Sequence, residues 1–304
     1  MKFLSFTEGR ERRLGLLEES GDVVDLTALL RGFPGHGLPA VPTDVSELIE
    51  LGEPALDAIK ACLASSGDAA RDARSLDQIR VLAPIRVKKN VFCVGRNYRD
   101  HIIEGNLARG RPADQFPKAI EFFTKPPTAV IGHGDSVQRQ AGLTDSLDYE
   151  AEFAIVIGRR GRNISRAEAL DHVFGYTIVN DVTARDLQLR HGQWFKGKGL
   201  DTSCPMGPVV VHRSAIANPN GLDVSLTVNG ELRQSDNTAS MIFTVEAIIE
   251  QLSAGMTLEP GDVIATGTPK GVGFARTPPA CLQVGDVVSA TVQHIGTLTN
   301  IVSE

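Results

Sequence analysis

Apolar residues in the first 80 positions form short runs that are separated by turn residues. Two such runs, at positions 14–17 and 23–26, flank a Ser-Gly-Asp turn at positions 20–22, which predicts a β-hairpin. Farther along, Pro54 precedes apolar residues at helical spacing, and proline is tolerated in the first turn of a helix. The pattern therefore predicts a hairpin followed by a helix in this part of the chain.

Beyond residue 80 the pattern changes to short strands. Apolar runs at positions 91–95, 153–157 and 176–179 have the length and composition of buried strands. Asn229-Gly230 lies between two further extended runs, and this dipeptide is the strongest short signal for a hairpin turn. These features predict that the greater part of the chain is built from sheet.

Two helices are expected in the same region. The spacing of Ser165 and Glu168 is that of a capping box, which predicts a short helix that Gly175 can end. Apolar residues between positions 242 and 252 recur at helical spacing, and Gly255 closes that pattern. Because strands outnumber helices, the predicted fold class is a sheet-rich α+β protein.

The small, polar segment 65–75 divides the chain into two compositional parts. It reads equally well as a linker or as a surface loop within one domain. We expect a small N-terminal domain over residues 1–80 and a larger domain over residues 81–304.

Composition and charge restrict the function. The chain has 304 residues, 42% of them hydrophobic, which is enough for a sizeable core. Its 31 Lys and Arg against 37 Asp and Glu leave no basic excess for binding nucleic acid. No apolar run approaches the roughly 18 residues of a membrane-spanning helix, and the N-terminus does not resemble a secretory signal. With four widely spaced cysteines, these features predict a cytoplasmic protein with no membrane or nucleic-acid partner.

Acidic residues gather where a predicted strand begins. Asp148, Glu150 and Glu152 alternate directly before and into the apolar run, so they are expected to share one face of the strand. Asp181 follows another predicted strand and adds a further carboxylate. Glu150, Glu152 and Asp181 could bind a hard divalent cation, since all their ligand atoms are oxygens. The alternative is an exposed edge whose acids pair with Arg159, Arg160 or Arg185, and the spacing alone does not decide between the two.

A histidine and a glutamate follow the strand predicted at positions 91–95. His101 and Glu104 are three residues apart and are therefore neighbours on a helical turn. A carboxylate that orients an imidazole suits a general base. The simpler alternative is a surface helical turn. Lys125 and Lys198 could bind an anionic substrate, although most lysines are merely solvated.

Taken together, seven segments resemble the fumarylacetoacetate hydrolase family, in the order in which that family carries them. They are VGRNYRDHIIE, FFTKPPTAVIGHGD, LDYEAEFAIVIG, GYTIVNDVTARDLQ, WFKGKGLDTSCPMGP, TVNGELRQ and LEPGDVIATGTPKGVG. The resemblance covers about residues 80–304 and is weak before that point. It implies a mixed β-sandwich roll preceded by a small variable N-terminal domain, a homodimer, and a bound Mg²⁺ or Mn²⁺.

The resemblance also implies roles for individual residues. By position, Glu150, Glu152 and Asp181 would be the metal ligands. His101, Glu104 and Lys198 would be catalytic, and the substrate-binding residues would be Lys125, Gln188 and Thr268.

The leading hypothesis for the function is a metal-dependent hydrolase that cleaves a C–C bond in a 2-oxo acid such as an acylpyruvate, through an enolate. A metal-stabilised enolate is equally the intermediate of decarboxylation and isomerisation. A decarboxylase or isomerase of 2-oxo dicarboxylates, or a lyase of the ureidoglycolate type, is therefore the first alternative. A catalytically silent ligand-binding protein on the same scaffold is the second.

Overall fold

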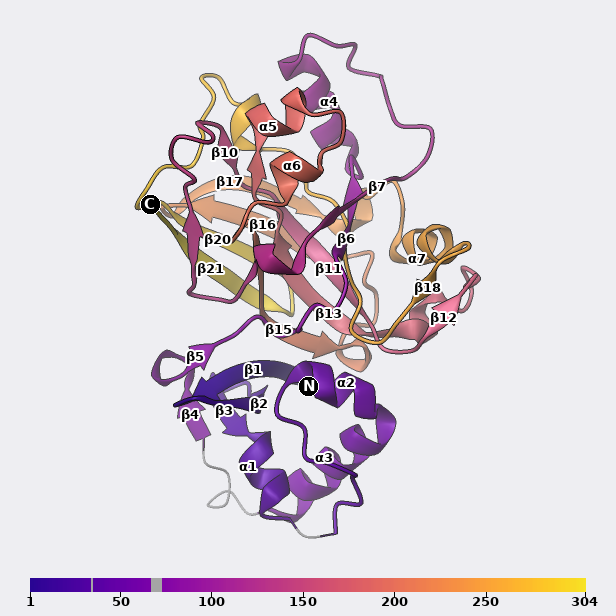
Figure 1. Ribbon diagram of the computed structural model, residues 1–304. Helices are drawn as coiled ribbons and strands as arrows, with labels where there is room; N and C mark the ends of the chain where they lie inside the picture. Colours follow the sequence, from indigo (N-terminus) through magenta and orange to yellow (C-terminus); the bar gives the residue numbers. More distant parts are fainter. Residues whose placement is uncertain (34, 67–72) are drawn as a thin grey trace.

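The computed structural model describes residues 1–33, 35–66 and 73–304, and strands dominate it (Figure 1). The strands are β1 (Lys2–Glu8), β2 (Glu11–Leu17), β3 (Asp22–Asp25), β4 (Ala73–Ser75), β5 (Arg80–Val81), β6 (Val91–Gly95), β7 (Glu121–Lys125), β8 (Val130–Ile131), β9 (Ser136–Gln138), β10 (Leu147–Asp148), β11 (Ala151–Ile157), β12 (Gly161–Arg162), β13 (Val173–Asn180), β14 (Thr183–Ala184), β15 (Cys204–His212), β16 (Asp223–Val228), β17 (Glu231–Asn237), β18 (Thr257–Leu258), β19 (Val263–Ala265), β20 (Val287–Val292) and β21 (Gly296–Ser303). The α-helices are α1 (Leu26–Arg31), α2 (Val45–Leu51), α3 (Glu53–Ser65), α4 (Arg99–Ala108), α5 (Arg185–Arg190), α6 (Phe195–Lys198) and α7 (Val245–Ser253). The sheet-rich α+β class predicted from the sequence is confirmed.

Most strands belong to two sheets. The larger sheet has the order β4-β3-β2-β1-β15-β13-β11-β19-β6-β7, with β5 beside β1 and β8 beside β15. The smaller sheet has the order β17-β16-β20-β21-β9. The pairs β10–β14 and β12–β18 form two further sheets of two strands each. Strands β15, β13, β11, β19 and β6 thus lie next to one another in the larger sheet, and the acidic residues lie at the ends of β11 and β13.

The N-terminal part shares the large sheet with the rest of the chain. Lys2 and Phe3 of β1 pair with Val211 and Val210 of β15, while α1, α2 and α3 gather around the N-terminal strands (Figure 1). The predicted hairpin (β2–β3) and the helix that starts near Pro54 (α3) are confirmed. The possible linker falls mainly on residues 67–72, outside the described residues, and the domain boundary at residue 80 stays a prediction.

Strand β11 explains why the central strands read as continuous apolar runs. All seven of its residues are buried, and they alternate between two cores. Phe153 and Ile155 pack in the cluster shared with the smaller sheet. Ala154 and Val156 pack in the cluster that includes residues of α1, α2 and α3. The sheet is therefore covered on both faces, and its strand ends are fixed from both sides.

Residues 165–175 do not form the predicted helix. They contain one 3₁₀ turn, Ala169–His172, and Gly175 lies inside β13 instead of ending a helix. A Cβ atom on Gly175 would lie 2.2 Å from the carbonyl oxygen of Val211 on the neighbouring strand. The glycine therefore serves close strand packing, which a local pattern does not reveal.

The remaining turn and helix predictions are confirmed. Asn229 and Gly230 both have positive φ, 52° and 79°, as a type I′ turn between β16 and β17 requires. Helix α7 begins after Thr244, whose side chain accepts a hydrogen bond from the backbone N–H of Ala247. Among the helices of the described ranges, none combines the length and the apolar character that a bilayer crossing requires.

Candidate active site and metal centre

Three carboxylates meet at the paired ends of β11 and β13. Ala151 of β11 is opposite Asn180 of β13, so Glu150 and Glu152 lie beside Asp181, which directly follows β13. Each of the three residues is at most 4% exposed, and their ligand oxygens all lie within 4.8 Å of one another. The antiparallel register thus assembles the cluster predicted from the sequence, in a buried position rather than at an exposed edge.

Asp148 does not share the face of this triad. The chain leaves the strand at Tyr149 and Glu150, so the alternation predicted from Asp148 to Glu152 is interrupted. The Asp148 carboxylate accepts hydrogen bonds from the backbone N–H groups of Gly273 and Phe274 and from Nε of Arg185, at 2.7, 3.1 and 2.9 Å. Its contacts are those of a residue that positions Arg185 and the loop carrying Phe274.

Buried cations contact the triad. Lys198 Nζ lies 2.6 Å from Glu150 Oε2 and 2.5 Å from Asp181 Oδ2. Lys125 Nζ lies 2.7 Å from Asp181 Oδ1, and Arg185 Nη2 lies 2.7 Å from Glu150 Oε1. Of the three arginines considered as partners in the sequence, Arg185 is the one that pairs with the cluster. These ion pairs partly neutralise Glu150 and Asp181.

The carboxylates differ in how well they are neutralised. Burial raises the pKa of Glu150, but Arg185 and Lys198 outweigh burial and hold that pKa below its usual range. Burial, followed by repulsion from Asp181 and Glu150, raises the pKa of Glu152 well above its usual value. In the part of the chain that the structure describes, Glu152 forms no ion pair and accepts a hydrogen bond from the backbone N–H of Gly267. A carboxylate with this surplus charge, next to two others, fits a hard divalent cation with oxygen ligands.

The predicted His–Glu pair forms on α4. His101 Nδ1 lies 3.0 Å from Glu104 Oε1, and both Glu104 oxygens also accept from the backbone N–H of Gly271, at 3.0 and 2.9 Å. Glu104 therefore orients the imidazole and ties α4 to the loop before η7 (Gly273–Ala275). Of the two ring nitrogens of His101, Nδ1 is therefore the one that Glu104 engages.

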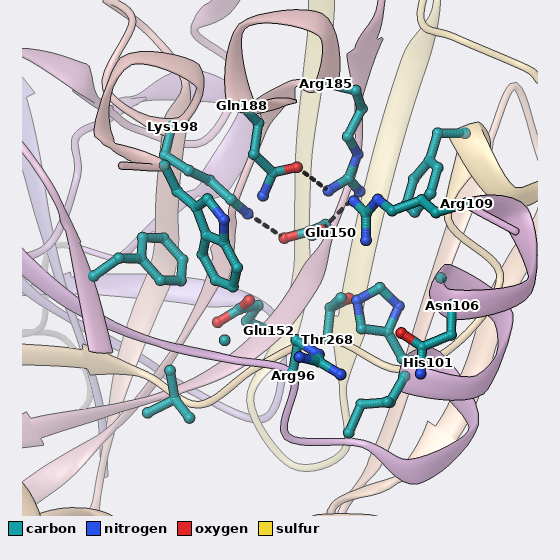
Figure 2. Close-up of a pocket in the computed structure, with 17 residues that line it drawn as sticks. Arg96, His101, Asn106, Arg109, Glu150, Glu152, Arg185, Gln188, Lys198 and Thr268 are labelled. Atoms are coloured by element: carbon teal, nitrogen blue, oxygen red, sulfur yellow. Dashed lines mark hydrogen bonds and ion pairs between the residues drawn. The ribbon is translucent and has the colours of Figure 1, made fainter. Parts of the chain in front are cut away.

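A single pocket brings these groups together (Figure 2). The predicted site residues that line it are His101, Glu150, Glu152, Gln188, Lys198 and Thr268. The other three do not line it: Glu104 contacts His101, and the buried Asp181 contacts the buried Lys125. Thr268 Oγ1 donates to the carbonyl of Ala151 at 2.9 Å, which places the loop after β19 against β11.

Some pocket residues were not proposed from the sequence. Arg96, Asn106 and Arg109 reach it from the β6–α4 segment, and Trp194 and Phe274 supply aromatic walls. Arg109 directly follows α4, two helical turns after His101, so its place near His101 has a local signal in the sequence. The contribution of Phe274, from the far end of the chain, has no such local signal.

This fold and site define a class: a two-sheet α+β protein with a buried carboxylate triad at the floor of a pocket and a His–Glu pair on a bordering helix. Residues 90–303 match the family model described as fumarylacetoacetate (FAA) hydrolase C-terminal. Oxaloacetate tautomerase YisK of Bacillus subtilis is 56% identical over 227 residues, 74% of either chain. The mitochondrial oxaloacetate tautomerase fahd2 of Xenopus laevis is 39% identical over 291 residues, 95% of this chain and 85% of that one.

Comparison of the fold with solved structures leads to the same family. The solved structure of a fumarylacetoacetate hydrolase from Exiguobacterium antarcticum superposes with a TM-score of 0.83 at 42% identity, covering 100% of this chain and 99% of that one. The chain belongs to the fumarylacetoacetate hydrolase family, as its seven ordered motifs indicated, and it has the fold of that family's enzymes. The reaction type and the roles of the site residues stay predictions.

Proposed function

We propose that the chain is a metal-dependent keto–enol tautomerase of a 2-oxo dicarboxylate of the oxaloacetate type. The observation that carries the proposal is that His101, held by Glu104, lines the same pocket as Lys198 and the carboxylates Glu150 and Glu152. Tautomerisation requires one acid–base group beside stabilised negative charge, and no attacking water. Two curated relatives named oxaloacetate tautomerases support this choice over hydrolysis.

In the proposed mechanism, His101 moves a single proton. Its Nε2 removes the proton from the carbon next to the keto group and returns it to the keto oxygen, or the reverse, so that the substrate changes only in the position of one hydrogen and one double bond. Glu150, Glu152 and Asp181 would hold Mg²⁺ or Mn²⁺, which would supply positive charge next to the oxygen on which negative charge develops. Lys198 adds a second positive charge on the same side of the pocket. Gln188 and Thr268 orient the substrate.

The test is the decay of the ultraviolet absorbance of enol-oxaloacetate in a buffer with Mg²⁺ or Mn²⁺. We expect the purified protein to accelerate ketonisation above a blank that contains the metal alone, and chelation to abolish the acceleration. A rate equal to the metal blank, with correctly folded protein, would reject tautomerase activity. Comparing the two metals at equal free concentration also tests which one the site prefers.

A second candidate is the C–C bond hydrolase that the sequence favoured. The oriented His101 also suits water activation, and the similar structure from Exiguobacterium antarcticum is named a fumarylacetoacetate hydrolase. Here His101 would take a proton from water, hydroxide would add to the distal acyl carbon, and the C–C bond would break to give a carboxylic acid and an enolate. Release of pyruvate from acetylpyruvate or fumarylpyruvate identifies this reaction.

Assays of the same purified protein with other substrates distinguish the remaining alternatives. Carbon dioxide release from oxaloacetate above the metal blank indicates a decarboxylase, and glyoxylate release from ureidoglycolate indicates a lyase. Turnover of none of these compounds, with intact ligand binding, supports a silent binding protein. The homodimer and the cytoplasmic location also stay predictions; light scattering on the purified protein tests the first, and fractionation of the source cells tests the second.

A further inference from the structure

Arg109, the residue directly after α4, points into the pocket (Figure 2). Its guanidinium carbon lies 4.7 Å from the centroid of the Phe274 ring, and that of Arg185 lies 4.5 Å from the same centroid. Gly105, one helical turn before Arg109, lies beside this contact: a Cβ atom there would be 3.6 Å from Arg109 Nη1 and 3.7 Å from Phe274 Cζ. Arg109 is therefore held in place by stacking rather than by a counter-ion.

The other cations of the pocket have carboxylate partners. Lys198 pairs with Glu150 and Asp181, Arg185 pairs with Asp148 and Glu150, and Arg96 lies 3.4 Å from Glu121. Within residues 1–33, 35–66 and 73–304, Arg109 forms no ion pair, and its buried Nε has no hydrogen-bond partner. A buried polar group without a partner costs free energy, so this atom is a candidate for a contact with a ligand.

The electrostatic surroundings of Arg109 favour an incoming anion. Burial lowers the pKa of Arg109 to about 10, and repulsion from Arg185, Arg111 and Arg96 acts in the same direction, against attraction from Glu150. At neutral pH the guanidinium is still charged. A carboxylate placed beside it would relieve the repulsion and supply the missing acceptors, and the planar guanidinium can hold both carboxylate oxygens at once.

The position of Arg109 indicates which substrate group it meets. The triad comes from the ends of β11 and β13, whereas His101 is on α4 and Arg109 directly follows α4. We propose that Arg109 binds the distal carboxylate of a 2-oxo dicarboxylate and thereby selects dicarboxylates over 2-oxo monocarboxylates of equal length. This inference rests on the proposed function, in which the 2-oxo acid end of the substrate faces the triad.

A matched pair of ligands tests the proposal without turnover. L-malate and 2-hydroxybutyrate have the same chain length and the same 2-hydroxy acid end, but 2-hydroxybutyrate has a methyl group where malate has its distal carboxylate. Calorimetric titration of each ligand, in the presence of Mg²⁺, gives the ratio of their dissociation constants. We expect the unmodified protein to prefer malate by about 10- to 100-fold, the range for a hydrogen-bonded charged group.

The decisive variant is R109Q, with R111Q as the control. Arg111 is exposed and does not line the pocket. We expect R109Q to reduce the preference for malate to less than threefold while its affinity for 2-hydroxybutyrate stays within twofold, and R111Q to behave like the unmodified protein. An unchanged preference in R109Q, or no preference in the unmodified protein, would overturn the role of Arg109.

Two further outcomes are informative. If R109Q binds neither ligand, R109K is the deciding variant, because a lysine keeps the charge but not the planar pair of donors. A preference for malate that is lowered at least threefold in R109K supports the proposal, and an unchanged preference rejects it. The proposed function fails separately, in the enol-oxaloacetate assay of the unmodified protein. A protein that prefers malate through Arg109 but does not accelerate ketonisation would retain this specificity site and lose the tautomerase assignment.

Discussion

The two walls of the pocket are built differently. On one side, Glu150 and Glu152 line the pocket at the ends of central strands, next to Asp181, and all three are almost completely buried. On the other side, the His101 and Glu104 side chains are 12% and 23% exposed, on a helix whose charged residues contact the loop at Lys270 and Gly271. The first side, called the strand wall here, is packed between two hydrophobic cores. The second side, called the helix wall, is held by a few polar contacts.

The difference in rigidity between the two walls matches two different requirements, a metal site and groups that act on the substrate. A cation site made of like charges needs a rigid frame, because the carboxylates would otherwise move apart. In the proposed function, proton transfer and substrate selection need groups that approach the substrate from another direction, and His101 of α4 and Arg109, directly after α4, are the groups proposed for this. We expect changes in the strand wall to remove metal binding and activity together, and changes in the helix wall to affect activity or selectivity with metal binding intact.

The largest effect is expected from Glu150→Gln in the strand wall. The amide keeps the shape but removes a charge that the metal site and the pocket cations share. We expect loss of tautomerase activity by at least about 10³-fold, and Mn²⁺ binding too weak to measure by calorimetry. Asp145→Asn is the control, because the Asp145 side chain is fully exposed, and it should change neither quantity. Normal activity in Glu150→Gln would remove the triad from the mechanism.

In the helix wall, His101→Ala should have the next largest effect. Removing a general acid–base group typically lowers the rate by about 10²- to 10⁴-fold. Affinity for Mn²⁺ should stay within twofold, because the metal ligands come from other elements. If His101→Ala kept the full ketonisation rate, the His101–Glu104 pair would be a structural feature of α4 and the proton would have to move through another group.

Glu104→Gln should have a smaller effect, because Glu104 acts through His101. The amide can still contact Gly271 and His101 but no longer offers a charge, so we expect a rate lowered by about 10- to 100-fold with a shifted pH profile. Asp100→Asn tests whether this is merely loosening of α4. It removes the exposed ion pair with Lys270, which is expected to contribute at most about 1 kcal/mol, and should leave the pH profile unchanged. Equal pH profiles in the two variants would reject orientation of His101 by Glu104.

The strand wall was largely predictable from the sequence, for physical reasons. Alternating acids before an apolar run, and an acid after the next one, specify strand ends through local periodicity. What the sequence could not supply is the register that sets Ala151 opposite Asn180, since this depends on pairing between distant segments. The break after Asp148 was missed for the same reason: it follows from the contacts of Asp148 with Arg185 and Gly273.

The helix wall was predicted less completely. His101 and Glu104 are close in sequence, so their contact follows from helical geometry alone. The role proposed for Arg109 depends on Phe274, which is 165 positions away, and on Arg109 having no ion-pair partner among the described residues. Gly175 gives the same lesson for the fold: it resembled a helix end locally, but the carbonyl of Val211 on β15 determines its place in a strand.

The smallest effect concerns the free energy of unfolding, and here we expect opposite results for two residues of the strand wall, Glu150 and Glu152. In metal-free protein, Glu150→Gln weakens contacts to Arg185 and Lys198, so we expect the free energy of unfolding to fall by about 1–3 kcal/mol.

Glu152 has no such partner among the described residues, and its raised pKa reports that the folded state disfavours its charge. Stability from a raised carboxyl pKa is present at low pH and is lost as pH rises through the folded-state value. Glu152→Gln should therefore equal or exceed the unmodified protein in stability at neutral pH, while losing Mn²⁺ binding. Urea unfolding with chelator present measures both variants, and a loss in Glu152→Gln equal to that in Glu150→Gln would show that the two carboxylates are equally well neutralised without metal.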